Sequence, residues 1–346
     1  MNKPDRITLI GNTPSPYTRK MTALLRYRHI PYSIIWADPK EVLEEKGIAQ
    51  PKVALLPTFI FEDQDQPYAM VDSTPIIRKL EEANQGRSVL PQDPKIAFID
   101  YLLEDFADEW CTKYMFHYRW HSEDDADNAG TMLPFCMDPS MPTEKQQWAK
   151  DFISKRQIDR LYVVGSNDTT ASVIDASYRR FLQAMEAHLA NQPFMLGARP
   201  GAGDFGLFGQ LTQLIGFDPT PRSIAHELSP RTVAWSLLVD DLSGLEPKQG
   251  GWNEFDEIPT TLKGLLNEVG RVYVPALLAN AKALQADEKE WETEIDGARW
   301  AQQTFPYQGK CLQWINEQYR ALSDSDREKI DQLFSGTGCE AMLEDF

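Results

Sequence analysis

The order of short apolar segments near the start of the chain constrains its fold more than any other feature. An apolar run, Ile7–Ile10, ends at Gly11, which is typical of a buried strand. Apolar side chains at helical spacing follow Ser15, and Tyr32–Trp36 has the composition of a second strand. These segments have the order and length of a βαβ unit, which predicts two parallel strands joined by a helix.

A hairpin and a further helix are expected next. Thr58–Phe61 and Tyr68–Val71 predict two strands, and Asp63–Gln66 between them has the composition of a turn, which indicates antiparallel pairing. Apolar side chains then recur at helical spacing from Thr74 onward. This part of the chain therefore predicts a small α/β domain that combines parallel and antiparallel strands.

Three short segments place polar groups at the ends of these elements. Ser15 precedes Pro16 at a helix start, where a side-chain cap and a proline are common. Pro57 begins a strand, a position where a missing N–H is tolerated. Asp72 and Ser73 lie between the second hairpin strand and the helix that follows it. We expect these three segments, each at the end of a strand or the start of a helix, to converge on one small ligand.

These segments resemble the N-terminal, thioredoxin-like domain of the cytosolic glutathione transferases. The proline of that family, which is normally cis, corresponds to Pro57, and its acidic–serine pair corresponds to Asp72 and Ser73. Its catalytic position at the start of the first helix corresponds most simply to Ser15. The resemblance implies a thioredoxin-like α/β fold with a site for glutathione.

The resemblance extends into a helical second domain. Gly201–Phe205 is similar to the family's capping motif before a buried helix, although that motif usually begins with Ser or Thr. We expect a thioredoxin-like glutathione-binding domain over residues 1–86, a linker over 87–94, an all-α domain over 95–245 and a helical extension over 246–346. The extension has no counterpart in the resemblance.

The net charge of the chain limits the classes of molecule that are expected as its partners. The formal net charge of −17 argues against nucleic acid and anionic membrane surfaces as partners. Glutathione is itself anionic, so its site needs positive potential from helix N-termini and from basic residues such as Arg19, Lys20 or Lys52. No apolar run is long enough to span a membrane, and Met1–Arg6 lacks the apolar core of a signal peptide.

The four cysteines are scattered, without a Cys-x-x-Cys pair, which favours free thiols in a reducing cytoplasm. No cluster of His and Cys indicates a metal site. We therefore expect glutathione as a cosubstrate and no metal cofactor.

An enzyme that attacks with glutathione must lower the pKa of its thiol, because the thiolate is the nucleophile. A helix N-terminus and a hydroxyl that donates a hydrogen bond both stabilise a thiolate, and Ser15 combines the two. Tyr17 and Asn12 are alternatives, because classes of the family use Tyr, Ser, Cys or Asn near this position. The absence of cysteine at position 15 argues against disulfide exchange. An ordinary helix cap is the other explanation for Ser15.

Leu56 is expected to bind glutathione through its backbone. A cis bond before Pro57 turns the N–H and C=O of Leu56 outward, where an extended peptide pairs with them. Ser73 suits the α-carboxylate of the γ-glutamyl group, and Asp72 suits its ammonium. The alternatives are a trans proline at a strand start, and an Asp–Ser pair that only caps its own helix.

The second domain is expected to bind the electrophile. Tyr101–Trp120 predicts one long helix, and in the family this helix flanks the hydrophobic-substrate site, which makes Trp110, Cys111 and Tyr114 candidate lining residues. The alternative is that these side chains pack in the core or at a subunit interface. Residues 121–147 are acidic and then rich in Pro and Met, which predicts a loop-like excursion.

The extension predicts further helices, whose ranges are Thr261–Ala286 with an interruption at Pro275, Trp291–Gln303, Lys310–Leu322 and Ser325–Phe334. Such an extension lengthens the helical domain, covers the active-site mouth or forms an oligomer surface.

Two functions are compatible with these features. The first is a serine-type glutathione transferase that directs the glutathione thiol at a hydrophobic electrophile, and the resemblance implies a cytoplasmic homodimer. The second is a non-catalytic binding or scaffold protein on the same fold, because a fold alone does not fix a function. Asp72 and Ser73 favour the enzyme, and the long extension favours a specialised partner role.

Overall fold

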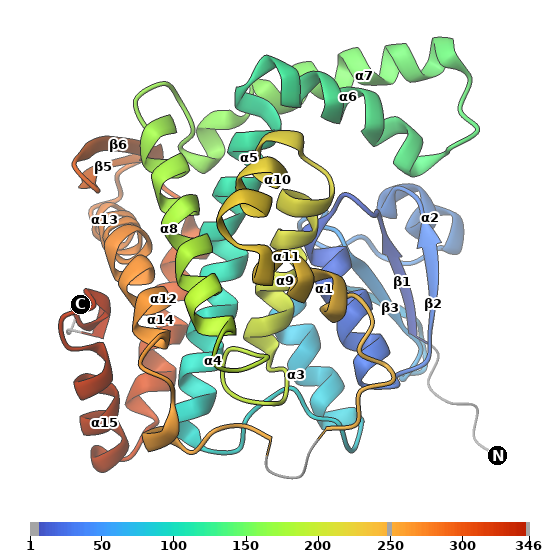
Figure 1. Cartoon of the computed structure of the whole chain (residues 1–346). Coiled ribbons are helices and arrows are strands. Elements are labelled where there is room, and N and C mark those ends of the chain that lie inside the picture. Colours follow the sequence, from blue (N-terminus) through green and yellow to red (C-terminus); the bar gives the residue numbers. More distant parts are fainter. Residues whose placement is uncertain (1–6, 248–250, 344–346) are drawn as a thin grey trace.

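The computed structural model describes residues 7–247 and 251–343 (Figure 1). A four-stranded sheet with its helices forms the N-terminal part, and helices form most of the rest. The chain is thus a small α/β domain followed by a helical domain, as the sequence predicts. Met1–Arg6, on which the expectation of no signal peptide rests, lies outside the described residues.

The N-terminal sheet has a mixed topology. Its elements are β1 (Ile7–Gly11), α1 (Pro16–Tyr27), β2 (Tyr32–Trp36), α2 (Pro39–Lys46), β3 (Thr58–Phe61), β4 (Tyr68–Met70) and α3 (Ser73–Ala83). The strand order is β2-β1-β3-β4; β1 pairs in parallel with β2 and antiparallel with β3, and β3 pairs antiparallel with β4. The predicted βαβ unit and hairpin are confirmed.

The two faces of the sheet are covered by different helices. Leu9 and Phe59 belong to the same buried cluster as side chains of α1 and α3, whereas Ile10 and Ile60 pack with side chains of α2. This division follows from the strand period of two, which points neighbouring side chains to opposite faces. The helices α1 and α3 therefore lie between the sheet and the helical domain (Figure 1).

One helix is central to the helical part. The elements are α4 (Pro94–Phe106), η1 (Ala107–Cys111), α5 (Thr112–His121), α6 (Glu123–Met137), α7 (Thr143–Ile158), η2 (Leu161–Val164), α8 (Ala171–Leu189), α9 (Ala202–Gly216), α10 (Pro219–Leu228) and α11 (Pro230–Val239). The almost completely buried α9 packs against α1 and α4. The predicted long helix is present, but it passes through a π-helical segment, η1, between α4 and α5. Such bulges often occur at functional sites.

The expected loop over residues 121–147 is wrong, because this segment contains α6 and the start of α7. The Ser122 side chain caps α6 by accepting a hydrogen bond from the backbone N–H of Asp125 (3.2 Å). Three acidic residues occupy the first turn, where the helix dipole favours negative charge. The acidic run that indicated a loop is therefore a helix start.

Gly201 precedes α9 without a side chain that could cap it, and another helix supplies the cap. The carboxylate of Asp100, on α4, accepts hydrogen bonds from the backbone N–H groups of Ala202 (3.1 Å) and Gly203 (3.0 Å). Asp204 accepts one from the N–H of Gly201 (2.9 Å). The departure from the family motif is thus compensated by a carboxylate that lies a hundred residues earlier in the chain.

The extension is folded and packs on the helical domain. It consists of η3 (Phe255–Glu257), α12 (Leu262–Glu268), η4 (Val269–Tyr273), α13 (Val274–Gln285), β5 (Glu290–Ile295), β6 (Ala298–Gln303), α14 (Pro306–Arg320), α15 (Asp324–Phe334) and η5 (Cys339–Leu343). Both α14 and α15 contact α4 (Figure 1), and the ring centroids of Phe334 and Phe98 lie 5.9 Å apart. The π-helical η4 ends at Tyr273, two residues before Pro275, where an interruption was expected.

The predicted helix over Trp291–Gln303 is wrong, because this segment is the β5–β6 hairpin. Asp296 and Gly297 form its turn, with φ values of 50° and 81°. An Asp-Gly pair favours this kind of turn, since both positions require positive φ. Trp291 and Trp300 are buried on the side that faces the helices. None of the described helices is long and apolar enough to cross a membrane.

Candidate functional site

Ser15 lies at the N-terminus of α1, with an extended backbone (φ −92°). Its hydroxyl oxygen accepts a hydrogen bond from the backbone N–H of Thr18 (3.2 Å), and the residue is partly accessible. Asn12 donates its own backbone N–H to the Thr18 hydroxyl (3.3 Å). Ser15 is therefore a helix cap whose hydroxyl hydrogen can still be donated, because a hydroxyl has one hydrogen and two acceptor sites.

Tyr17 points away from the helix start, toward the helical domain. Its hydroxyl donates to the backbone carbonyl of Asp108 (2.6 Å). Burial raises the pKa of Tyr17 well above its usual value, and the Glu109 and Asp108 carboxylates raise it further. Tyr17 thus stays protonated with its hydroxyl hydrogen in use.

Leu56 and Pro57 precede β3. The peptide bond between them is cis, as the resemblance implied. Leu56 is partly accessible and Pro57 is buried. The nearby Thr58 hydroxyl donates to the carbonyl of Leu55 (2.8 Å), which holds the chain at the strand start.

Asp72 and Ser73 form the start of α3. Asp72 has a positive φ of 78°, and its Oδ1 accepts a hydrogen bond from the backbone N–H of Thr74 (3.2 Å). Ser73 is 6% exposed, and its hydroxyl oxygen accepts a hydrogen bond from Nζ of Lys20 (2.9 Å). Because Lys20 belongs to α1, this contact ties together the two helices that begin at Ser15 and Asp72.

Lys20 is a fully buried cation. Its Nζ also lies 2.9 Å from Oε1 of Glu104 and 2.6 Å from Oδ2 of Asp108. Burial lowers the pKa of Lys20, but the Asp108 and Glu104 carboxylates outweigh burial, so this pKa is raised above its usual value. Lys20 is therefore charged, and two carboxylates neutralise most of its field.

The two carboxylates differ in their partners. Burial raises the pKa of Glu104, but Arg78 (Nη1–Oε2, 2.7 Å) and Lys20 outweigh it and lower that pKa to about 2. Burial also raises the pKa of Asp108, to about 6, although Lys20 opposes the rise. Oδ1 of Asp108 is buried without a hydrogen-bond partner among the described atoms.

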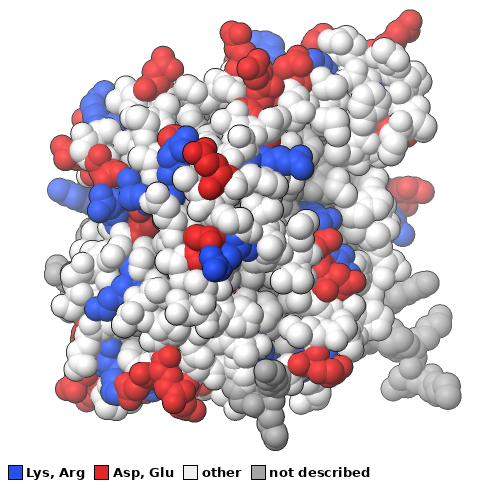
Figure 2. Space-filling model, in the orientation of Figure 1, with Lys and Arg blue, Asp and Glu red and all other residues white. Residues whose placement is uncertain are grey.

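The other two basic residues expected near the site differ from Lys20. Arg19 pairs with Asp240, which Arg26 also contacts, and Lys52 is exposed. On the face drawn in Figure 2, acidic and basic side chains are interspersed. Lys20 thus places its charged group against a predicted site residue, Ser73, whereas Arg19 contacts Ser15 through its backbone N–H (3.1 Å).

Trp110, Cys111 and Tyr114 are buried in the core, each at most 1% exposed. Nε1 of Trp110 donates to the Tyr114 hydroxyl (3.1 Å), and the ring centroids of Trp110 and Trp300 lie 5.4 Å apart. Tyr114 also bonds to the hydroxyl of Ser177 on α8 (2.7 Å). Their packing is that of core residues, which was the alternative explanation for them.

Another face of the same helix is accessible instead. Asp105, Glu109 and Thr112 are partly accessible and recur at helical spacing. Burial raises the pKa of Glu109 to about 8, and the Asp105 carboxylate contributes to this rise. Sequence reasoning missed this face, although polar residues at positions i, i+4 and i+7 in an otherwise apolar helix could have indicated it.

The extension supplies two further residues that the sequence did not reveal. The hydroxyl of Tyr307 donates to Oδ2 of Asp72 (2.7 Å). Nε2 of Gln308 donates to Oε2 of Glu109 (3.2 Å). The first turn of α14 therefore contacts both the start of α3 and the accessible face of the long helix.

Comparison with protein families decides the assignment. The model of the glutathione S-transferase N-terminal domain matches residues 9–88, and that of the glutathione S-transferase C-terminal domain matches residues 157–237. The chain belongs to the glutathione transferase superfamily. In this member of the superfamily, the N-terminal match contains Ser15, Pro57 and Asp72, whereas Glu109 and Tyr307 lie outside both matches.

Comparison with curated proteins found no match for this superfamily member. Among solved structures, FzlA from C. crescentus is 15% identical with a TM-score of 0.39, over 67% of this chain and 86% of that chain. The Tau class glutathione S-transferase from mango, Mangifera indica, is 16% identical with a TM-score of 0.38, over 75% and 94%. A Burkholderia graminis glutathione transferase with two glutathione molecules bound per subunit is 16% identical with a TM-score of 0.42, over 72% and 92%.

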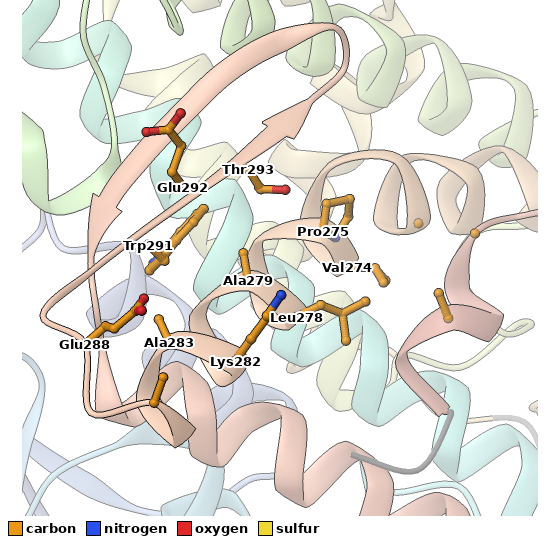
Figure 3. A pocket seen from close by; sticks show the side chains of 14 residues that line it. Val274, Pro275, Leu278, Ala279, Lys282, Ala283, Glu288, Trp291, Glu292 and Thr293 are labelled. Carbon is orange, nitrogen blue, oxygen red and sulfur yellow. The ribbon is translucent and has the colours of Figure 1, made fainter.

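Two cavities of this transferase-family chain lie away from Ser15 and Asp72. A groove of about 780 Å³ is lined by α13, β5 and the segment near η5, with Leu278, Lys282 and Trp291 among its walls (Figure 3). A second cavity of about 480 Å³ lies between α6 and α10. Neither contains a predicted site residue. We place the candidate site at Ser15 and Asp72 because of the polar groups there. The size of a cavity does not by itself identify a reactive or ligand-binding group.

Proposed function

We propose that this protein is a glutathione transferase that activates the thiol of bound glutathione with Ser15. Leu56 and Pro57 would bind the cysteinyl backbone, Ser73 the γ-glutamyl carboxylate and Asp72 its ammonium. One observation carries the proposal: the Lys20–Ser73 hydrogen bond joins the two helices whose N-termini bear Ser15 and Asp72. The N-termini of these two helices provide positive potential for an anionic peptide.

Two interactions that stabilise the thiolate account for the proposed activation of the thiol. A thiol with a pKa of about 8.5 is only about 3% ionised at pH 7. A nearby helix N-terminus contributes about 0.3–1 kcal/mol to the thiolate. A hydroxyl that donates to the thiolate contributes about 1.5–3 kcal/mol. At about 1.4 kcal/mol per pKa unit, these two effects together lower the thiol pKa by about one to three units. The proton passes to solvent. The sulfur forms a bond to a carbon of the electrophile while the bond from that carbon to its leaving group breaks, and the leaving group departs with the electron pair of that bond.

We propose that the electrophile lies against the accessible face that carries Glu109 and Thr112. This face adjoins Tyr17, whose hydroxyl contacts Asp108. The hydrophobic character predicted for the electrophile rested on Trp110, Cys111 and Tyr114, which are packed in the core. The proposal therefore extends to electrophiles that also carry polar groups.

The family resemblance also underlies two further proposals, a homodimer and a cytoplasmic location. All four cysteines are free thiols, as a reducing compartment requires. Sedimentation that detects only a monomer would remove the first of these proposals.

The second candidate function is a non-catalytic binding or scaffold protein. The Tyr307–Asp72 contact favours this candidate, because a residue of the chain itself occupies an acceptor intended for glutathione. In this second candidate, glutathione binding is lost or incidental, whereas the enzyme must bind glutathione and activate its thiol.

Calorimetric titration with reduced glutathione at neutral pH tests the proposal. We expect micromolar to millimolar binding by the natural chain and about tenfold weaker binding by Asp72→Asn, which loses the charge but keeps an acceptor for Thr74. Asp63→Asn is the matched control, because Asp63 lies in the hairpin turn of the same domain and pairs with Lys79 of α3. No binding up to several millimolar glutathione would contradict the enzyme and favour the scaffold.

A further inference from the structure

The extension contacts the proposed glutathione site through the first turn of α14. Tyr307 donates to Oδ2 of Asp72 in the sheet domain (2.7 Å), and Gln308 donates to Glu109 in the helical domain (3.2 Å). Tyr307 and Asp72 are 235 residues apart in the chain. A single turn of helix thus bridges both walls of the site.

This turn is held firmly by its neighbours. The fully buried side chain of Asn280, on α13, accepts from the backbone N–H of Phe305 (2.7 Å) and donates to the carbonyl of Phe305 (3.0 Å). One turn beyond Tyr307, Cys311 is buried at 1% exposure. The ring of Trp314 packs edge-on against Tyr307, with centroids 5.9 Å apart. The Tyr307 hydroxyl is therefore presented to Asp72 by a fixed scaffold.

Both oxygens of Asp72 already accept hydrogen bonds. Oδ1 caps α3 through the N–H of Thr74 (3.2 Å), which leaves Oδ2 as the oxygen not needed by the helix. Tyr307 occupies that oxygen as a donor. Burial raises the pKa of Tyr307, and the adjacent Asp72 charge raises it further, so the phenol keeps its proton. An ammonium group is also a donor and would seek the same oxygen.

We propose that Tyr307 is a latch on the glutathione site, and that the γ-glutamyl ammonium must displace its hydroxyl from Asp72 in order to bind. This inference rests on the proposed function. The latch lowers the affinity for glutathione, because a charge-assisted hydrogen bond must break before the ligand makes its own. It acts on ligands that carry the amine and not on ligands that lack it. The affinity of the site for glutathione thereby depends on the contact between Tyr307 of the extension and Asp72.

The experiment compares Tyr307→Phe with the natural chain by calorimetric titration. We expect Tyr307→Phe to bind glutathione about tenfold more tightly, which corresponds to about 1.4 kcal/mol. Tyr319→Phe is the matched control, since Tyr319 lies on the same helix and donates to Asp331, away from Asp72. Glutaryl-cysteinyl-glycine, which is glutathione without its amine, should bind the natural chain and Tyr307→Phe equally.

Hydrogen exchange supplies a second readout. Glutathione should increase exchange at the backbone amides of residues 307–311 in the natural chain, because binding removes the Tyr307–Asp72 hydrogen bond, which is one of the contacts that hold this turn. If the natural chain binds glutathione and Tyr307→Phe binds it equally or more weakly, the latch is wrong and the proposed function stands. If neither chain binds glutathione, both proposals are wrong. Binding by Tyr307→Phe alone supports both.

Discussion

Asp100 and Gly201 are so close that a β-carbon added to Gly201 would lie 2.2 Å from Oδ1 of Asp100. The same carboxylate accepts the backbone N–H groups of Ala202 and Gly203 and so caps α9. A carboxylate from α4 and a residue without a side chain therefore replace the capping residue that the family usually has. Because α9 packs against α1, this arrangement fixes the helix against which the Ser15 end of the site is built.

Gly201→Ser, which restores the usual family residue, should destabilise this protein. The new β-carbon would displace the Asp100 carboxylate and weaken two buried hydrogen bonds, so we expect a loss of about 1–3 kcal/mol in the free energy of unfolding. Urea unfolding measures this loss. Gly216→Ala, at the other end of α9, is the control, because a β-carbon there meets no atom within 4 Å. Equal or greater stability of Gly201→Ser would contradict the capping role of Asp100.

Lys20→Met should be among the most destabilising substitutions on α1. It leaves Asp108 buried without its cation and removes one of the two cations from Glu104. Loss of one partner from a buried ion pair costs about 3–5 kcal/mol, because the remaining charge stays buried without compensation. Thermal or urea unfolding checks this expectation.

Lys40→Met is the matched control for Lys20→Met. Lys40 and Glu44 form an exposed pair on α2, 3.9 Å apart, and such pairs contribute at most about 1 kcal/mol. Similar stability losses in the two variants would show that the ion pairs of Lys20 with Glu104 and Asp108 contribute no more to stability than an exposed pair.

Glu109→Gln should change how stability depends on pH. The pKa of Glu109 is raised by burial from 4.5 to about 8, so the folded state binds more protons than the unfolded state between these values. The contribution of Glu109 to stability is therefore complete below about pH 4.5 and is lost as the pH rises through about 8. Gln carries no charge, so the variant should equal the natural chain at pH 4.5.

At pH 8 the Glu109→Gln variant should be more stable by about 1–2 kcal/mol, a value reduced for partial water access. Urea unfolding at the two pH values measures the difference. Glu317→Gln is the control, because Glu317 accepts an exposed hydrogen bond from Gln313 (2.7 Å) much as Glu109 accepts one from Gln308. A pH-independent difference for Glu109→Gln would refute the raised pKa.

Local signals predicted much of the N-terminal fold and missed parts of the rest. The positions of Ser15 and Asp72 at helix starts follow from capping, which depends on a few neighbouring residues. The β5–β6 hairpin was missed although Asp296–Gly297 between its strands is a turn signal.

The walls of the site depend on contacts that no local pattern encodes. Trp110 and Glu109 are neighbours in sequence but lie on different faces of a helix that contains a π-helical segment, so the aromatic cluster is core and the carboxyl is accessible. The Tyr307–Asp72 contact joins residues 235 positions apart. Such a contact depends on how the extension packs, which the sequence pattern does not determine.

The pKa of the thiol of bound glutathione tests the proposed activation most directly. It is measured from the ultraviolet absorbance of the thiolate as the pH is raised. We expect a pKa of about 5.5–7.5 on the natural chain and on Ser15→Thr, which retains a hydroxyl. On Ser15→Ala, glutathione should still bind, and its thiol pKa should return toward about 8.5. A bound thiol that titrates near 8.5 on the natural chain would contradict the proposal that this protein activates glutathione.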